Sequence, residues 1–512
     1  MGRDTFFVTS PIYYPNDVPH IGHAYDAVAV DFVARYHRLR GEEVFHLTGT
    51  DEHGLKLQRA AEAAGTSPQD WVDQMEPRWR EVWARLDISY DDYIRTTEPR
   101  HEAAVRRLLT AVYENGREDI YLGTYEGLYC VSCEAYYTEG DLVDGNCPIH
   151  GRPVEHVTEE NYFFRLSAYA ERLLERYTAT PSAVEPATRR NEVLSLIRAG
   201  LQDFSISRTN FDWGIPLPWD PAHVCYVWFD ALTNYVTAAG YGSDAERFAR
   251  LWPANIHMIG KDILRFHAIY WPAMLMAAGL ESPTQVWAHG FLTVGGQKMS
   301  KTNATGIHPF ELIDHFGVDS YRYYFMREIR FGEDGNFSWE SMVDRHNADL
   351  ANGLGNLASR VLAMLGTSFG GAVPEPALEG SQADLPDVVA DAVRRYEEHM
   401  GAVRLHDALA AVWDVVDRAN GYLVEKEPWK LAKDPARASD LAGVLYASAE
   451  TLRILAVLIS PIMPGAGSRL WAQLGIAEPL DAQRLPAAAR WGTLEPGTKT
   501  TKGESLFPRL EA

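Results

Sequence analysis

The chain has 512 residues, a formal net charge of −22 at pH 7 and only four cysteines. This length is too great for a single hydrophobic core and predicts two to four domains, and the 14 Trp and 25 Tyr exclude a disordered chain. The acidic charge would repel a polyanion, so any nucleic-acid binding must depend on local basic and aromatic residues, and no DNA partner is expected.

The N-terminal residues MGRDTFFVTS contain no basic region followed by an apolar stretch, so no secretory signal is expected. The most apolar stretch, 452–463, is too short to cross a bilayer and is interrupted by Pro461. We therefore expect a cytoplasmic protein without a membrane-spanning segment.

The first 54 residues predict a strand, a helix and a second strand. The apolar run 6–8 predicts a strand, and apolar residues at helical spacing from Tyr25 to Tyr36 predict a helix that ends before Gly41. A second strand, 43–47, leads into the polar run 50–54. This order is typical of doubly wound, nucleotide-binding sheets.

The pattern then changes twice. Between about 116 and 222 a Cys- and Gly-containing segment interrupts the α/β pattern, which resumes with strand-like runs at 225–229 and 256–262. After about 345 the apolar spacing is helical. The predicted fold class is α/β: a Rossmann-like, doubly wound parallel sheet split by an insertion and followed by an α-helical bundle.

The segment between the first strand and its helix contains His20, Gly22 and His23. Backbone N–H groups at a helix N-terminus favour phosphate, and the two imidazoles would add hydrogen bonds to a triphosphate. Without a side chain, Gly22 would let an adenine approach the backbone. The alternative is a loop with two ordinary histidines.

A second candidate segment is Lys298-Met299-Ser300-Lys301-Thr302, which follows a strand-like run at 290–294 and the pair Gly295-Gly296. Lys298 and Lys301 would stabilise the charge that develops on a leaving pyrophosphate. Taken alone, two lysines in a loop usually indicate only a solvated surface.

The predicted insertion contains Cys130-x-x-Cys133 and, after a spacer of thirteen residues, Cys147-Pro148-Ile149-His150. Two short-spaced pairs of ligands suit one tetrahedral, structural Zn²⁺ held by three thiolates and one imidazole. Cys225 lies too far along the chain to be needed. The alternative is four unlinked residues.

In this order, His20-Ile21-Gly22-His23 and Lys298-Met299-Ser300-Lys301 resemble the two signatures of class I aminoacyl-tRNA synthetases, and the details are most similar to the methionyl-tRNA synthetases. The resemblance covers nearly the whole chain. It implies a methionine–tRNA ligase that activates L-methionine with Mg²⁺-ATP and transfers it from methionyl-adenylate to the 3′ end of tRNA(Met), initiator and elongator. Thr302 replaces the commonest Ser but retains the hydroxyl.

The same resemblance implies the substrate-binding residues. A thioether offers shape and polarizability but little hydrogen bonding, so its site needs aromatic walls. Asp51 would bind the ammonium group and Asp262, with Gly260, the ribose. Leu232 departs from the proline of some members, and Arg208 matches an arginine near the reacting groups, with a structural salt bridge as its alternative. The residues expected around methionine are Ile12, Tyr14, Asp51, Trp228, Tyr235 and His267, with Phe266 and Trp271 outside them; the alternative is that these aromatics belong only to the core.

In the helical part, Asn356 and Arg360 are four residues apart and share one helix face. Together with Trp429 they match the residues that read the CAU anticodon in the family, and unpaired RNA bases are where proteins read sequence. The alternative is a buried Trp and a surface pair.

We expect a monomer whose five segments are 1–115 and 223–290 (the two halves of the catalytic domain), 116–222 (the insertion with the zinc knuckle), 291–345 (the lysine loop and stem-contact region) and 346–512 (the anticodon-binding domain).

Three alternative functions remain. A class I synthetase for isoleucine, valine or leucine needs a larger insertion, and one for cysteine does not need these aromatics. A small-molecule nucleotidyltransferase needs no helical bundle. A non-catalytic tRNA-binding paralogue has no reason to keep the histidines and lysines together.

Overall fold

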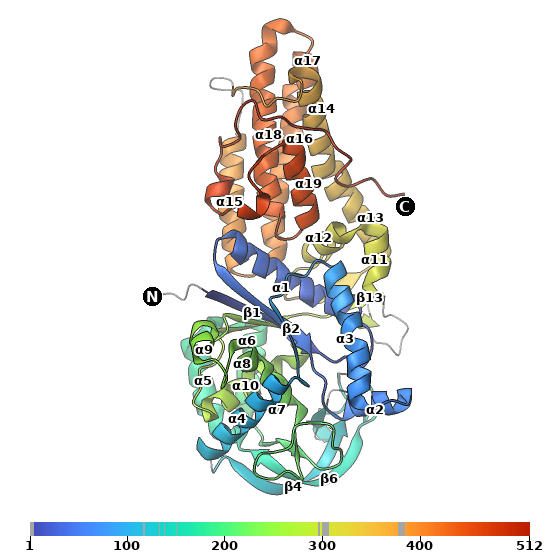
Figure 1. Cartoon of the computed structure of the whole chain (residues 1–512), viewed down its shortest axis with the longest axis vertical. Helices are drawn as coiled ribbons and strands as arrows, with labels where there is room; N and C mark the ends of the chain where they lie inside the picture. The colour runs from blue at the N-terminus through green and yellow to red at the C-terminus, as the bar shows by residue number, and fades with distance from the viewer. Residues whose placement is uncertain are drawn as a thin grey trace. The chain divides into compact units, whose positions relative to one another are not determined.

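The structure is a computed structural model that describes residues 5–115, 118–132, 134–137, 139–149, 151–294, 297–298, 307–376 and 384–511. The chain forms two compact units (Figure 1). The first unit comprises Met1–Val30 and Glu43–His289, and the second comprises Asp31–Glu42 and Gly290–Ala512. Helix α1 (Ile21–Leu39) belongs to both.

The first unit is built on a parallel sheet of six strands in the order β3-β2-β1-β11-β12-β7. Buried apolar residues form these strands, as expected for a parallel sheet covered on both faces. The strands are β1 (Thr5–Tyr13), β2 (Glu43–Thr50), β3 (Asp92–Arg95), β7 (Val184–Glu185), β11 (Ile256–Gly260) and β12 (Gln285–His289). The prediction of a parallel sheet split in sequence is confirmed.

The strand order reverses between β1 and β11. From β1 the chain proceeds outward through β2 and β3, whereas β11 and β12 lie on the other side of β1. In doubly wound sheets the carboxyl ends of the strands at such a switch point form the ligand-binding crevice. The predicted segments that follow β1, β2 and β11 all lie at this edge.

Nine α-helices of the first unit, besides α1, lie within its described residues. Pro68 begins α3, whose Ser67 accepts the N–H of Asp70 as an N-cap. The helices are α2 (Leu55–Ala64), α3 (Pro68–Arg85), α4 (Pro99–Asn115), α5 (Ala170–Ala179), α6 (Ala187–Ala199), α7 (Val227–Leu232), α8 (Asn234–Ala239), α9 (Ala245–Leu251) and α10 (Trp271–Ala277).

A second, antiparallel sheet lies within the predicted insertion, in the order β5-β4-β6-β8. Its strands are β4 (Ile120–Cys130), β5 (Ala135–Tyr137), β6 (Glu155–Phe164) and β8 (Phe204–Ser205). Strand β7 also comes from this segment, yet it pairs with β12 in the central sheet.

The strand predicted at 225–229 is wrong. Only β10 (Val224–Cys225) is extended, and it pairs antiparallel with β9 (Ser207–Arg208) outside the central sheet. From Val227 the chain is helical as α7. A short apolar run has the same sequence pattern in a buried strand and in a buried helix, so periodicity does not distinguish them.

The second unit is mainly helical, as predicted. A small sheet in the order β14-β13-β15 precedes the bundle, with β13 (Leu292–Val294), β14 (Gln297–Lys298) and β15 (Gly335–Phe337). The helices are α11 (Pro309–Phe316), α12 (Val318–Glu328), α13 (Trp339–Arg345), a π-helical turn (His346–Gly355), α14 (Asn356–Phe369), α15 (Leu385–Gly401), α16 (Leu405–Lys426), α17 (Pro428–Leu431), α18 (Ala438–Ile459) and α19 (Pro464–Leu474).

The core of the bundle is organised around α18, which lies beside α14 and α16 in Figure 1. Within the described residues, one segment, Pro435–Ile459, is long and apolar enough to cross a membrane, but 94% of its most apolar window is buried inside the protein. Such burial is what the central helix of a bundle requires. Within the same unit, Arg322 and Asp31 form a fully buried ion pair of 2.6 Å.

Candidate active site

His20 and His23 lie where β1 leads into α1. The backbone N–H of Gly22 donates to Nδ1 of His20 over 3.1 Å, and the N–H of His20 donates to Nδ1 of His23 over 3.2 Å. The two rings stack with their centroids 3.7 Å apart. Because each Nδ1 accepts a hydrogen bond, each neutral ring carries its proton on Nε2. The loop therefore carries two imidazoles protonated on Nε2 beside the N-terminus of α1.

Gly260 and Asp262 lie at the end of β11, next to β1 in the sheet. A Cβ on Gly260 would stand 2.6 Å from Oδ1 of Asp262, which is closer than real Cβ contacts allow. The glycine thus lets the carboxylate of Asp262 fold back against the strand end.

Asp51 follows β2 directly and is 3% exposed. Its N–H donates to the carbonyl of Tyr13 over 2.9 Å, which holds it beside the end of β1. Oδ1 of Asp51 and the hydroxyl of Tyr14 are buried and have no hydrogen-bond partner in the described part of the chain. Burial, together with the negative charges of Asp230 and Glu134, raises the pKa of Asp51 well above its usual range, and the nearby hydroxyl of Tyr14 offsets only part of this rise. A cationic partner would donate hydrogen bonds to the two unpartnered atoms and would lower the raised pKa of Asp51.

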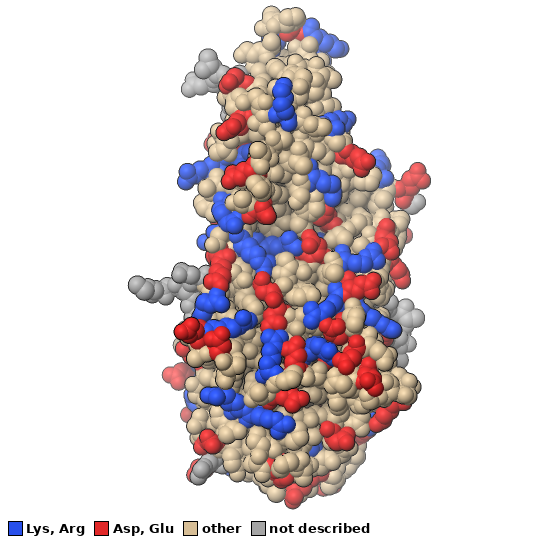
Figure 2. Space-filling model, viewed as in Figure 1, with Lys and Arg blue, Asp and Glu red and all other residues tan. Residues whose placement is uncertain are grey.

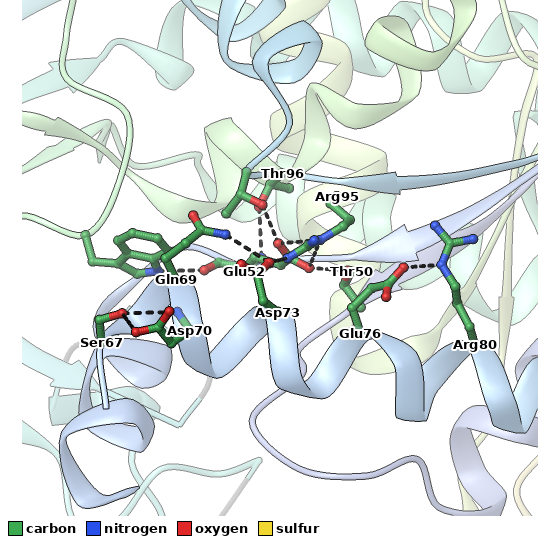
Figure 3. A network of polar contacts seen from close by, with 12 residues as sticks. Thr50, Glu52, Ser67, Gln69, Asp70, Asp73, Glu76, Arg80, Arg95 and Thr96 are labelled. Atoms are coloured by element: carbon green, nitrogen blue, oxygen red, sulfur yellow. Dashed lines mark hydrogen bonds and ion pairs between the residues drawn. The ribbon is translucent and has the colours of Figure 1, made fainter. Parts of the chain in front are cut away.

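The next residue, Glu52, anchors this loop (Figure 3). Its buried carboxylate accepts hydrogen bonds from Thr50 (2.7 Å), Thr97 (2.5 Å) and Nε of Arg95 (2.8 Å). Its N–H donates to Thr96 over 2.8 Å. With both the carboxylate and the N–H bonded, the backbone next to Asp51 has little freedom.

His53 fixes the loop on another side. Its Nδ1 lies 2.7 Å from Oδ2 of Asp230, a residue of α7, and Nε2 of His101 lies 2.7 Å from Oδ1 of the same carboxylate. All three side chains are buried. The nearby imidazoles outweigh burial and lower the pKa of Asp230 to about 2. Asp230 therefore stays ionised and connects the Asp51 loop to α7.

The aromatic residues predicted around methionine belong to one packed region of the first unit. The indole of Trp228 stacks on Phe266 with ring centroids 3.8 Å apart. Ile12, Tyr14 and Trp228 are half-buried against the core cluster that contains Phe266. Tyr235 lies 6.3 Å from the buried Trp271 between ring centroids.

Tyr235 and His267 form a directed pair within this region. Nδ1 of His267 lies 3.0 Å from the carbonyl of Ile263, which can only accept, so Nδ1 carries the proton. Nε2 therefore accepts the hydroxyl hydrogen of Tyr235 over 2.8 Å. Burial lowers the pKa of His267 to about 4 and keeps the ring neutral at pH 7.

The two predicted lysines lie in the second unit. The backbone of Lys298 ends β14, which pairs with β13. Lys301 and Thr302 lie outside the described residues.

Two of the four predicted zinc ligands are described. Cys130 ends β4 and Cys147 lies in a tight turn, in which the N–H of Gly151 donates to its carbonyl over 2.8 Å. Both cysteines are buried and form no disulfide. Cys133 and His150 lie outside the described residues, and the residues that are described contain no group of three potential metal ligands.

The predicted anticodon residues cluster in the second unit. The guanidinium of Arg360 lies over the ring of Trp429, 5.3 Å from its centroid. Trp429 is 38% exposed on α17. Asn356, at the start of α14, donates to the side-chain oxygen of Asn420 over 3.3 Å. Asn356 and Arg360 lie on α14 and Trp429 lies on α17, so the contact between Arg360 and Trp429 joins the two helices.

Arg208 forms a buried, bidentate ion pair with Glu159 at 3.0 and 3.1 Å. This geometry agrees with the structural alternative stated for it. Sequence reasoning did not identify Glu52, His53, Asp230 or Glu134 as supports of the site. The only available signal in the sequence was their position, within two residues of Asp51, Trp228 or Cys133.

Comparisons with known proteins identify the family of the chain. The family described as tRNA synthetases class I (M) matches residues 6–154 and 141–362, and the anticodon binding domain of methionyl tRNA ligase matches residues 373–512. A methionine–tRNA ligase of Streptomyces coelicolor is 51% identical over 529 aligned residues, covering 100% of this chain and 97% of that protein. One of Mesorhizobium japonicum is 47% identical, covering 99% and 98%.

The fold also matches a solved structure, Mycobacterium tuberculosis methionyl-tRNA synthetase in complex with methionyl-adenylate. The TM-score is 0.95 at 44% identity, over 99% of this chain and 100% of the other. These likenesses extend over the catalytic and the helical parts alike. The chain therefore belongs to the methionyl-tRNA synthetases, the class I ligases that join methionine to tRNA.

Proposed function

We propose that the first unit forms methionyl-adenylate at the carboxyl ends of β1, β2 and β11. His20 and His23 donate from Nε2 to the phosphates of ATP, beside the N–H groups that begin α1. Gly22 admits the adenine, and Asp262 accepts hydrogen bonds from the ribose hydroxyls across Gly260. The switch point between β1 and β11 supports this placement.

Methionine binds next to this nucleotide site. The ammonium group is held by Asp51, and the thioether lies among Ile12, Tyr14, Trp228, Tyr235 and His267. The observation that carries the proposal is that Oδ1 of Asp51 and the hydroxyl of Tyr14 are buried without a hydrogen-bond partner among the described residues. Buried polar atoms without partners are costly, and a bound ammonium group would satisfy them.

The reaction needs no protein nucleophile. The methionine carboxylate attacks the α-phosphorus in line, the bond to the bridging oxygen breaks, and pyrophosphate leaves. Lys298 and Lys301 stabilise the charge that develops on the leaving group. Mg²⁺ brought with ATP would supply further positive charge at the phosphates. The tRNA 3′ hydroxyl then attacks the adenylate carbonyl and releases AMP.

The insertion binds one structural zinc through Cys130, Cys133, Cys147 and His150. Two buried, reduced thiols, one at a strand end and one in a tight turn, suit such a knuckle. Cys147→Ser is expected to lower the zinc content from one per chain toward zero, measured by elemental analysis. The control is Cys225→Ser, which changes the remaining buried cysteine outside the quartet and should retain the metal.

The second unit reads the anticodon with Asn356, Arg360 and Trp429. The exposed indole, with a guanidinium over its ring, offers a platform on which a base can stack. On the face in Figure 2, basic and acidic side chains are interspersed rather than gathered into one basic field. Because the net charge of −22 gives the chain no overall attraction for a polyanion, local contacts must supply the affinity for tRNA. The five segments predicted above, a cytoplasmic location and a monomeric state are part of the same proposal.

The test is ATP–pyrophosphate exchange with a panel of amino acids, with and without tRNA. Methionine alone is expected to support exchange, and tRNA should not be required. Asp51→Asn should raise the methionine KM about 100-fold, the cost of losing a buried charge partner, and leave the ATP KM within about 3-fold. The control Asp87→Asn changes an exposed carboxylate of the same unit. Exchange with another amino acid instead of methionine would refute the proposal.

A further inference from the structure

Glu134 follows the predicted zinc ligand Cys133 directly, yet it is only 1% exposed, and its carboxylate accepts hydrogen bonds from Lys56 on α2 and from Tyr129 on β4. Its backbone adopts a left-handed conformation with φ +51°. Such a conformation is uncommon for a residue with a side chain and costs free energy. The surroundings of Glu134 must compensate for that cost.

The carboxylate of Glu134 caps helix α2, although Glu134 lies 78 residues after Lys56 in the chain. Gly54, the residue before α2, provides no side-chain cap, so the first N–H groups of the helix need another acceptor. Oε1 of Glu134 accepts the N–H of Lys56 over 2.8 Å. A carboxylate at a helix N-terminus also interacts favourably with the helix dipole. The start of α2 is therefore fixed by a residue from the insertion.

Gly54 permits this contact because it has no side chain. Its φ of +101° is accessible mainly to glycine, and a Cβ there would stand 2.8 Å from Oε1 of Glu134. Gly54 ends the short loop that begins with Asp51. The carboxylate of Glu134 therefore lies close to the end of the loop that carries Asp51.

The other contacts of Glu134 reach the aromatic side of the methionine site. Its backbone carbonyl accepts the hydroxyl of Tyr226 over 2.6 Å, and Tyr226 precedes α7, which carries Trp228. Oε2 accepts the hydroxyl of Tyr129, on β4, over 3.1 Å. One residue of the insertion therefore bonds both to the start of α2, directly after the Asp51 loop, and to the segment leading to Trp228.

We infer that Glu134 is a positioning residue for methionine, which holds the Asp51 loop and the start of α7 at the separation that the amino acid requires. This inference rests on the proposed role of Asp51. Because Glu134 acts on a binding contact that is equal in the ground state and the transition state, its loss weakens methionine binding without slowing the chemical step. The insertion thereby takes part in the amino-acid site.

The test is steady-state ATP–pyrophosphate exchange by the full chain. Glu134→Ala is expected to raise the methionine KM about 10-fold or more, the effect of removing hydrogen bonds to a charged group, with kcat and the ATP KM within about 3-fold. Glu134→Gln retains an acceptor for the N–H of Lys56 and should restore the methionine KM to within about 3-fold of wild type.

Two further variants keep the test decisive. Tyr226→Phe removes only the hydroxyl bond to the carbonyl of Glu134 and should raise the methionine KM about 5-fold at unchanged kcat, even if Glu134→Ala does not fold. The matched control is Glu155→Ala, which breaks an exposed 2.8 Å ion pair between another carboxylate of the insertion and Arg59 on α2. It should behave as wild type.

The inference is overturned if folded Glu134→Ala keeps the wild-type methionine KM, if Tyr226→Phe does so where Glu134→Ala does not fold, or if kcat and both KM values change together. It is also overturned if Glu155→Ala has the same effect as Glu134→Ala. A wild-type methionine KM in Asp51→Asn would instead reject the proposed methionine site itself.

Discussion

Tyr235 donates its hydroxyl hydrogen to Nε2 of His267 over 2.8 Å, and the direction of this bond is set by the carbonyl of Ile263 on the other side of the imidazole. The hydroxyl oxygen of Tyr235 keeps its lone pairs for other contacts, and the buried ring of His267 has both nitrogens satisfied. The proposed aromatic site for the thioether thus contains one polar pair with a fixed orientation.

Removing that donor should weaken methionine binding. Tyr235→Phe leaves Nε2 of His267 buried without a donor, which costs about 1–3 kcal/mol. The methionine KM in pyrophosphate exchange is expected to rise about 10-fold, with the ATP KM unchanged. Tyr241→Phe, which alters a half-buried tyrosine just after α8, serves as the control. Equal KM values for Tyr235→Phe and wild type would separate this pair from methionine binding.

Stability should depend on pH through His267. Burial lowers the folded-state pKa to about 4, whereas an unfolded histidine titrates near pH 6.5, so the unfolded chain binds the proton first as the pH falls. The stabilisation present above pH 6.5 is therefore lost between about pH 6.5 and 4, and about 2 kcal/mol is gone at pH 5. In urea denaturation, wild type should lose about this much more than His267→Gln between pH 7.5 and 5. Parallel losses in the two proteins would contradict this assignment.

Lys301 should act on the transition state. In Lys301→Ala we expect methionine-dependent exchange to slow about 100-fold, while methionine binding, measured by equilibrium dialysis, stays within about 2-fold. The exposed Lys502 provides a matched substitution, Lys502→Ala, with no expected effect. An unchanged rate in Lys301→Ala would remove Lys301 from the reaction.

Trp429 should act on tRNA alone. Loss of a stacking surface costs about 1–3 kcal/mol per base, so Trp429→Ala should raise the tRNA KM in aminoacylation about 10-fold or more. Pyrophosphate exchange needs no tRNA and should keep its wild-type rate. Trp339→Ala removes an indole that is 43% exposed in the same unit and should leave the tRNA KM unchanged. If both variants raise this KM equally, the effect is not specific to the proposed anticodon site.

Much of the architecture can be predicted from the sequence because it depends on local patterns. Apolar runs and helical spacing predicted β1, α1, β2 and the helical bundle, and polar residues at strand ends indicated where a doubly wound sheet binds its ligands. The limit of this reasoning appears at 225–229, where one apolar run is part strand and part helix. Only packing decides between the two.

The sequence by itself determined the fold class of each unit and the family, and it predicted the residues that contact the substrates. Tertiary structure decided which polar atoms are paired: Arg208 with Glu159, His53 with Asp230, and Glu134 with the start of α2. These partners are 49, 177 and 78 residues apart in the chain. The spacing of residues along a chain encodes local periodicity, whereas the partner of a buried charge depends on the folded path of the whole unit, because only there are both groups removed from water together.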